Sequence, residues 1–290
     1  MDLKILAWNV EHFKGPKAAW RSLSGDEEAR ERAKSERVAR VVAQIQSIDP
    51  DIFAILEVEG DRSPYDVAAA MPDYSFLLTE GKQTQEILVG FRQRLRLFFT
   101  QKGEFKENNL YLRPAPTLSV QTPSGRTLTL LFGHFKSLPE PGGWGLRASM
   151  FEKLVDLKKA LDGYAQDKGE DSAAFVAMGD LNTMGLTLTD ADGDISADEE
   201  LARCDKRLAR VNMRRPGKSA AHTFSGGSTS SLDDSDLDHV YIDHSLSVLP
   251  ENGFDVRVGG WTTLPTQAER DQWINDYSDH APIWITLTGL

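Results

Sequence analysis

Five short polar motifs lie directly beside runs of apolar residues, and their side chains are carboxylates, amides and imidazoles. They are Trp8-Asn9-Val10-Glu11, Leu56-Glu57-Val58, Gly133-His134-Phe135-Lys136-Ser137, Gly179-Asp180-Leu181-Asn182, and Leu237-Asp238-His239 taken with Ser278-Asp279-His280-Ala281-Pro282. Carboxylate oxygens bind hard divalent cations, and imidazoles and carboxylates transfer protons. A single carboxylate at the end of a strand is more often a surface residue or a helix cap. The chemistry therefore depends on whether the fold brings all five motifs together.

The apolar runs predict the strands that must position these motifs. Several runs are continuous rather than alternating, as expected for strands covered on both faces. The predicted strands are 3–8, 52–57, 87–91, 127–134, 174–179, 238–242 and 283–287. Helices are expected over about 25–48, where Ser24-Gly-Asp-Glu27 has the form of a capping box, and near 147–162. Strands interleaved with helices, with no linker between halves, predict one layered α/β domain over 1–290.

Taken together and in this order, the motifs resemble those of the endonuclease/exonuclease/phosphatase superfamily, which includes DNase I-like nucleases, abasic-site endonucleases, inositol polyphosphate phosphatases and neutral sphingomyelinases. The match extends over 3–287, and its most specific parts are Gly-Asp-Leu-Asn and Ser-Asp-His-Ala-Pro. The resemblance implies a four-layer α/β sandwich of two packed mixed β-sheets flanked by helices, with the active site at one end. It also implies a phosphoesterase that depends on Mg²⁺ or Mn²⁺.

The resemblance carries over to individual residues of this chain. The matched catalytic positions are Asn9, Glu57, His134, Asp180, Asn182, Asp238, Asp279 and His280. Glu57 matches the metal-binding glutamate; Glu59 would share its strand face, but the apolar run followed by Glu-Val favours Glu57. Glu11 stands at a position that is acidic in some members, which makes it a second-rank metal ligand.

The chemistry of these residue types agrees with the assignment. Glu57 and Asp279 can hold Mg²⁺, which polarises a phosphoryl group and stabilises the leaving oxygen. Asp180 is the candidate that orients or deprotonates the attacking water. The neutral amides of Asn9 and Asn182 can donate to phosphate oxygens without repelling them.

The two histidines have different expected roles. His280 is interpreted as an imidazolium that contacts phosphate and is kept protonated by Asp238. His134 could act as a second acid near the leaving group, and Lys136 would add a positive charge two residues on. The alternative is a core histidine beside a surface lysine.

The overall charge is acidic, with 33 Lys plus Arg against 44 Asp plus Glu and a formal net charge of −11. This excess argues against polyanionic partners unless cations gather locally, but it suits carboxylates clustered around a cation. The single cysteine, Cys204, excludes a disulfide framework and a cysteine-rich metal site. The chain starts without a secretory signal and has no membrane-spanning run, so a cytoplasmic location without stable membrane association is expected.

Two further segments have a functional and a plain interpretation. A charged insertion at about 185–220 is acidic over 181–202 and carries seven bases over 203–218, which could form a phosphate-facing patch or a merely solvated helix and loop. The segment 139–147 is expected to be a loop, and its Trp144 could stack on a base or simply anchor the loop.

The residue types indicate the class of reaction more clearly than they indicate the substrate. The chain lacks the Asn-x-x-Gly-(Leu/Ile)-Arg and Gln-Glu patterns of abasic-site endonucleases and the apolar hairpin of sphingomyelinases. A metal-dependent nuclease acting on nucleic acid is therefore the leading hypothesis. The alternative is a phosphatase or phosphodiesterase for a small molecule or lipid headgroup, and the remote one is a catalytically inactive binding module. Endo or exo mode and the oligomeric state stay open.

Overall fold

The computed structural model describes residues 1–13, 25–59 and 62–290. Its first sheet has the order β11-β13-β1-β2-β4-β3, with β12 also paired to β13, and the second has the order β5-β6-β7-β8-β10-β9. The first sheet's strands are β1 (Leu3–Asn9), β2 (Ile52–Glu59), β3 (Tyr74–Leu78), β4 (Gln85–Arg92), β11 (Ser247–Val248), β12 (Val256–Val258) and β13 (Ile283–Thr288). The second sheet's strands are β5 (Leu97–Lys102), β6 (Ala115–Gln121), β7 (Thr127–His134), β8 (Ala174–Asp180), β9 (Met213–Arg214) and β10 (Asp238–Asp243).

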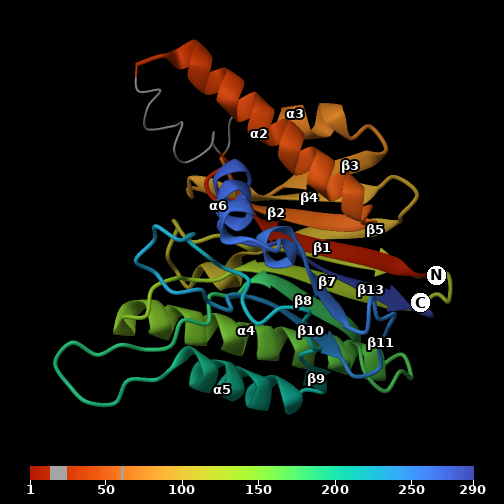
Figure 1. Cartoon of the computed structure of the whole chain (residues 1–290). Helices are drawn as coiled ribbons and strands as arrows, with labels where there is room; N and C mark the ends of the chain where they lie inside the picture. The colour runs from red at the N-terminus through yellow and green to blue at the C-terminus, as the bar shows by residue number, and fades with distance from the viewer. Residues whose placement is uncertain (14–24, 60–61) are drawn as a thin grey trace.

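Helices cover the outer faces of the two sheets (Figure 1). They are α2 (Glu27–Ile48), α3 (Ser63–Ala70), α4 (Pro141–Gln166), α5 (Ala197–Ala209) and α6 (Gln267–Asp276), with short 3₁₀ turns η1 (Gly103–Lys106) and η2 (Gly260–Thr263). In Figure 1, α2 and α3 lie above the first sheet and α4 and α5 below the second. The predicted four-layer sandwich of two mixed sheets flanked by helices is thus confirmed.

Burial explains why the strand sequences are so apolar. In β8, Ala174, Val176 and Met178 belong to the larger core cluster, whereas Phe175 and Ala177 pack in a second cluster with Phe151 of α4 and Leu208 of α5. Because successive side chains of a strand point to opposite faces, both faces of β8 are covered. All seven predicted strands are present, each within two residues of its expected limits at either end.

The helix predictions need two corrections. The helix predicted over about 25–48 is α2, but its N-cap is Asp26, whose side chain accepts a hydrogen bond from the backbone N–H of Ala29 at 2.9 Å. Ser24, the predicted cap, lies outside the described residues. The second helix starts at Pro141 rather than near 147, so Trp144 lies in its first turn and the predicted loop over 139–147 is wrong. A proline at the first helical position, with no N–H to satisfy, accounts for the earlier start.

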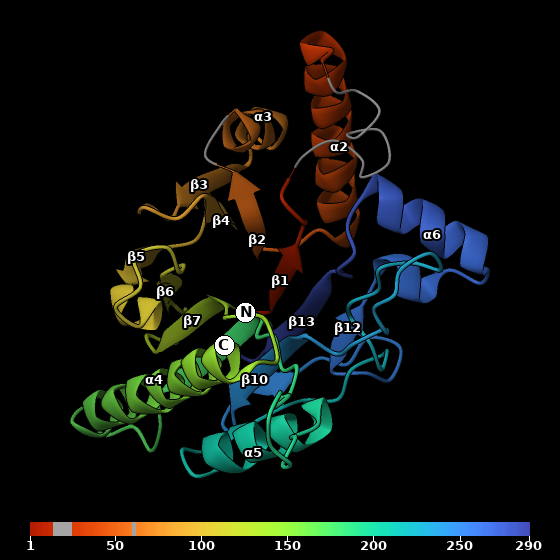
Figure 2. The ribbon, with the colours of Figure 1, turned by 90° about the vertical axis from the view of Figure 1, so that its left-hand side faces the viewer.

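Strand directions bring the polar motifs to one end of the sandwich. β1 and β2 run parallel, and so do β7 and β8, so that Asn9, Glu57, His134 and Asp180 lie at or near the ends of these strands. β10 and β13 are antiparallel to their neighbours β8 and β1 and therefore begin at the same end. This end lies opposite the two chain termini and faces the viewer in Figure 2.

The segment over 185–220 is an integral part of the second sheet's side of the molecule. Its helix α5 packs Cys204 and Leu208 onto that sheet, and β9 pairs with β10 as the edge strand. Within the described parts of the chain, no helix combines the length and apolar character that crossing a bilayer requires.

A buried ion pair fixes the two segments that leave β7 and β8. The Arg147 guanidinium, which is fully buried, forms two bonds with the Glu200 carboxylate at 2.8 and 2.9 Å. It also donates to the carbonyl oxygens of Lys136, Leu138 and Gly185 at 2.8–3.1 Å. One side chain of α4 therefore holds both chain segments in place.

We predict that Arg147→Ala lowers the free energy of unfolding by about 3–5 kcal/mol, because it leaves the Glu200 carboxylate buried without its partner. Equilibrium urea unfolding measures the change. Arg32→Ala is the control, since its pair with Glu28 at 3.5 Å is exposed and contributes at most about 0.5 kcal/mol. Equal effects of the two substitutions would show that the buried pair has no special role.

Candidate active site

The side-chain amide of Asn9 joins the two sheets at the site end. Its Nδ2 donates to Glu57 Oε1 at 3.1 Å, within the first sheet, and to Asp180 Oδ2 at 3.0 Å, in the second. Its Oδ1 accepts from the Glu11 backbone N–H at 3.0 Å, which fixes the orientation of the amide. Since both N–H groups bind carboxylates, Asn9 in this arrangement holds the site together rather than offering a donor to phosphate.

Glu57 occupies an irregular point of β2. Its φ is 62°, and the register between β2 and β4 shifts between Ile55 and Val58. Such a bulge redirects one side chain of a strand, a common device beside functional sites. The carboxylate is then fixed by the backbone N–H of His12 and by Gln85 Nε2, both at 2.9 Å from Oε2.

Three motif residues are direct neighbours across the second sheet. The strand register pairs His134 with Asp180, and Asp180 with Asp238. His134 Nε2 lies 3.5 Å from Glu57 Oε1 and 3.6 Å from Asp180 Oδ2. Burial, followed by the nearby positive charges, lowers the pKa of His134 well below its usual value. This direction favours a neutral His134, and its possible role as an acid stays a prediction.

His280 and Asp238 form the expected pair. His280 Nδ1 lies 2.8 Å from Asp238 Oδ2, and its Nε2 lies 3.9 Å from Asp180 Oδ2. Burial acts to lower the pKa of His280, but Asp238 and the other carboxylates outweigh it and raise the pKa well above the usual value. The imidazole is therefore held in its charged form.

Asp180 is almost fully buried, with 2% of its surface exposed. Burial raises its pKa, His280 opposes the rise, and Asp238 adds to it. A carboxylate whose pKa is raised from its usual value is a stronger base, which suits proton abstraction from water.

The guanidinium of Arg37 binds the backbone of two segments that carry acids of the site. Arg37 extends from α2 and donates to the carbonyl oxygens of Val10 at 2.7 Å, Glu11 at 3.2 Å and Tyr277 at 2.8 Å. It therefore ties the segment after β1 to the segment that carries Asp279. Burial lowers the pKa of Arg37 to about 10, whereas the charges of Glu11, Asp279 and Glu57 act to raise it, so all three acids lie within electrostatic reach of this group.

These acids fit a hard divalent cation. Glu57, Asp279 and Glu11 offer carboxylate oxygens only, the donor type that Mg²⁺ and Mn²⁺ prefer. Among the described residues, the group whose possible ligand atoms all lie within 4.8 Å of one another is instead Asp180, Asp238 and His280. A metal bound there would have to displace the proton that the neighbouring carboxylates stabilise on His280.

The remaining predicted residues differ in how deeply they are buried. Asn182 is buried with φ 52°, and its Nδ2 donates to the Phe135 carbonyl oxygen at 3.2 Å. Lys136 is half-buried and within electrostatic reach of His134. Trp144, half-buried in the first turn of α4, is not the exposed loop residue that the sequence predicted.

The bases of 203–218 are largely offset by carboxylates. Arg215 binds Asp205 at 2.7 and 2.9 Å, and Arg207 binds Glu152 at 2.8 Å. Arg214 lies 3.5 Å from Asp255, and Lys218 forms an ion pair with Asp236. Arg214 pairs in register with Ile242, at the end of β10 away from Asp238. Four of the seven bases are therefore paired with carboxylates, and Lys218 also donates to the Asp238 carbonyl oxygen at 2.8 Å.

Sequence reasoning missed three residues at the site. Gln85 links Glu57 to Arg113, whose guanidinium binds the Gln85 side-chain oxygen, and Arg37 supports the acids described above. For Gln85, the only sequence signal is that it and Glu86 are polar residues at the start of an otherwise apolar strand. Nothing in the local pattern identifies Arg113.

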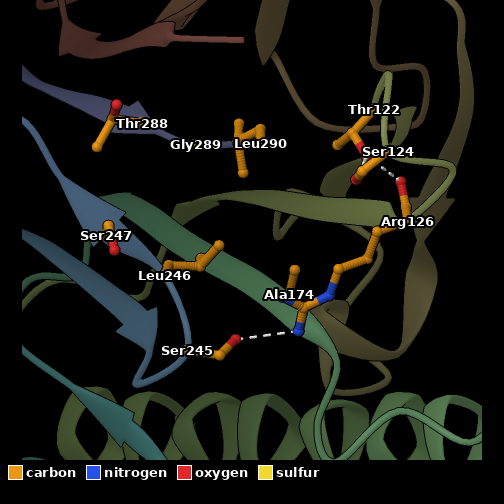
Figure 3. Close-up of a pocket in the computed structure, with 10 residues that line it drawn as sticks. All are labelled: Thr122, Ser124, Arg126, Ala174, Ser245, Leu246, Ser247, Thr288, Gly289 and Leu290. Atoms are coloured by element: carbon orange, nitrogen blue, oxygen red, sulfur yellow. Dashed lines mark hydrogen bonds between the residues drawn. The ribbon is translucent and has the colours of Figure 1, made fainter.

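A pocket at the opposite end of the sandwich is unrelated to these motifs. Hydroxyl side chains and Arg126 line it (Figure 3). Arg126 is already bound there by Glu170 at 3.2 Å, by the Ser172 carbonyl oxygen at 2.8 Å and by Ser245 Oγ at 3.0 Å.

Comparison with known proteins identifies the fold. No family model matches the chain, and no curated protein matches it. Among solved structures, truncated TDP2 from Caenorhabditis elegans matches with a TM-score of 0.65 and 18% identity, covering 100% of this chain and 98% of that one. A mannosyl-6-phosphatase from Bacteroides thetaiotaomicron matches at 0.59 and 16%, covering 99% and 100%. TDP2 from D. rerio, complexed with a single-strand DNA product, matches at 0.58 and 15%, covering 99% of each chain.

Other matching structures are described as endonuclease/exonuclease/phosphatase proteins. The chain therefore has the DNase I-like fold of the endonuclease/exonuclease/phosphatase proteins, and the resemblance found in the sequence is confirmed at the level of fold.

We predict that Asn9→Asp lowers the free energy of unfolding in EDTA by roughly 2 kcal/mol or more, because it removes two donors and places a third carboxylate between two others. Urea unfolding measures the change. Asn252→Asp, at an exposed turn, is the control. A loss no larger than that of the control would mean that Asn9 does not join the sheets energetically.

Proposed function

We propose that the protein is a divalent-metal-dependent phosphodiesterase that hydrolyses nucleic-acid phosphodiester bonds. One observation carries the proposal: the amide of Asn9 holds Glu57 and Asp180 together, and the Asp238–His280 pair lies beside them. This arrangement combines oxygen ligands, a buried base and a buried imidazolium at one end of the sandwich.

Glu57 and Asp279 would hold Mg²⁺ or Mn²⁺, with Glu11 as a further ligand. When bound, the cation supplies charge neutralisation for the phosphoryl oxygens and the leaving oxygen. The protein holds these acids ready, because Arg37 and Gln85 fix the backbone and the side chain that present them.

Asp180 orients the attacking water and accepts its proton. Its raised pKa favours this role, and hydrogen bonds from Asn9 to Oδ2 and from the Asn182 backbone N–H to Oδ1 fix the orientation of the carboxylate. His280, charged and fixed by Asp238, donates to a phosphoryl oxygen whose negative charge grows as the reaction proceeds. Neutral His134, Lys136 and Asn182 complete the contacts to the phosphate, and Trp144 is proposed only as a rim contact.

Nucleic acid is the favoured substrate, and the D. rerio TDP2 structure with a single-strand DNA product supports it by analogy of fold. The second candidate is a small phosphoester, which the matching mannosyl-6-phosphatase favours on the same grounds. A binding module without turnover is the remaining alternative, and it accounts poorly for a buried base beside a buried imidazolium.

We predict that the protein, supplied with Mg²⁺ or Mn²⁺, cleaves DNA or RNA oligonucleotides, and that EDTA abolishes the cleavage. Removing the imidazolium in His280→Ala or the base in Asp180→Asn should lower kcat by about 10²–10⁴-fold. Product formation is followed by gel electrophoresis. His244→Ala, an exposed histidine at the other end of β10, should have wild-type activity.

The same assay includes sugar phosphates and inositol phosphates. Turnover of these compounds with no cleavage of nucleic acid would replace the nuclease proposal by the second candidate. Tight binding of oligonucleotides without turnover of any substrate would instead identify a binding module.

A further inference from the structure

Two cations, Lys106 and Arg113, lie beside the site on the segment between β5 and β6. Both are held by neutral amide oxygens. Lys106 Nζ donates to Gln83 Oε1 at 2.7 Å, and the Arg113 guanidinium donates to Gln85 Oε1. Both glutamines are buried; Gln85 begins β4 and Gln83 lies two residues before it. We call these two cations the cationic ledge.

The ledge has no direct counter-charge. In the part of the chain that the structure describes, no carboxylate comes within 4.0 Å of either cation. Arg113 Nε is shielded from solvent and has no hydrogen-bond partner there. A shielded N–H on a cation lacks an acceptor, and leaving it unpaired is unfavourable. An anionic oxygen would satisfy both the charge and the hydrogen bond.

Glu57, Asp180 and Glu86 lie within electrostatic reach of Arg113, and Glu86 also lies within reach of Lys106, but none of them contacts either cation. Glu86 Oε2 accepts from Thr79 Oγ1 and from Gln83 Nε2, both at 2.6 Å. Burial raises the pKa of Glu86, and the hydrogen bonds from Thr79 and Gln83 oppose the rise. Replacement of either glutamine by glutamate would have neutralised a cation; the neutral amides leave both charged.

Hydrogen bonds link the cationic ledge to the candidate active site. The amide of Gln85 binds Arg113 through its oxygen and Glu57 through its nitrogen, at 2.9 Å. Arg113 is also within electrostatic reach of Asp180. A ligand bound to Arg113 would therefore be separated from Glu57 by the side chain of Gln85.

We propose that Lys106 and Arg113 form a second phosphate subsite, which binds the phosphate that flanks the scissile one in a nucleic-acid strand. This inference rests on the proposed function. The same segment presents Tyr111, which is 71% exposed, between the ledge residues, while its neighbour Leu112 is buried. An exposed aromatic ring close to a phosphate contact suits stacking on a base, which a single-stranded substrate offers.

The test compares two substrates of the Mg²⁺-loaded enzyme: a single-stranded DNA oligonucleotide and bis(p-nitrophenyl) phosphate, which has one phosphate only. In Lys106→Ala/Arg113→Ala, we expect kcat/KM for the oligonucleotide, relative to that for the small diester, to fall by about tenfold or more, mainly through KM. The slope of log kcat/KM against log salt concentration should become less steep by about 0.7 for one lost phosphate contact. Arg113→Lys keeps the positive charge and should therefore lose less than Lys106→Ala/Arg113→Ala.

The matched control is Lys159→Ala/Lys168→Ala, which removes the same charge from exposed residues near the other end of α4. It should leave the ratio and the salt slope unchanged, and thermal unfolding confirms that both double variants fold. Equal loss on both substrates, or an unchanged slope, would overturn the subsite. If the wild type hydrolyses the small diester but not the oligonucleotide, the proposed nucleic-acid function fails, and the flanking-phosphate subsite fails with it.

Discussion

The arrangement of the site depends on one neutral amide between two β-sheets. Each sheet contributes one carboxylate, Glu57 or Asp180, and the two N–H groups of Asn9 reach both. An aspartate or a leucine of similar size could not do this, because neither offers two donors. The distance between the sheets, which the core side chains set, therefore also sets the distance between the acids. Core packing at a distance from the site therefore influences the separation of Glu57 and Asp180.

Crowded carboxylates raise the question of what keeps this end of the molecule folded. The described cations near the acids come from separate parts of the chain: Arg37 from α2, His280 from the segment before β13, and Arg113 from the segment before β6. Each has different hydrogen-bond partners: Arg37 binds backbone carbonyl oxygens, His280 binds Asp238, and Arg113 binds Gln85. The net charge of −11 thus says little about the field that a phosphate would meet, and neither do the bases over 203–218, several of which are already paired.

The sequence predicted the strands and the motif positions well because both are local signals. Runs such as 174–179 are apolar on both faces, and a polar residue at their end is visible without any structure. Gln85 and Arg113 could not be found in this way, since their roles arise only when β4 lies beside β2 and the segment before β6 folds over both. The start of α4 was missed because glycines and prolines over 139–145 also fit a loop. The choice of Glu57 over Glu59 rests on family resemblance; the bulge in β2 and the bond to Asn9 support it.

Several residues beside the proposed chemistry have strained backbone conformations. Glu11, His12, Glu57 and Asn182 all have positive φ, between 45° and 62°, although none is a glycine. Such conformations cost of order 1–3 kcal/mol each and persist only where the surroundings impose them. Here the surroundings are identifiable: Asn9 Oδ1 binds the Glu11 N–H, Glu57 binds the His12 N–H, and the Leu237 carbonyl oxygen binds the Asn182 N–H at 3.1 Å. The same contacts that hold the acids in place therefore also offset the strain of presenting them, so loss of one contact would release several residues of the site together.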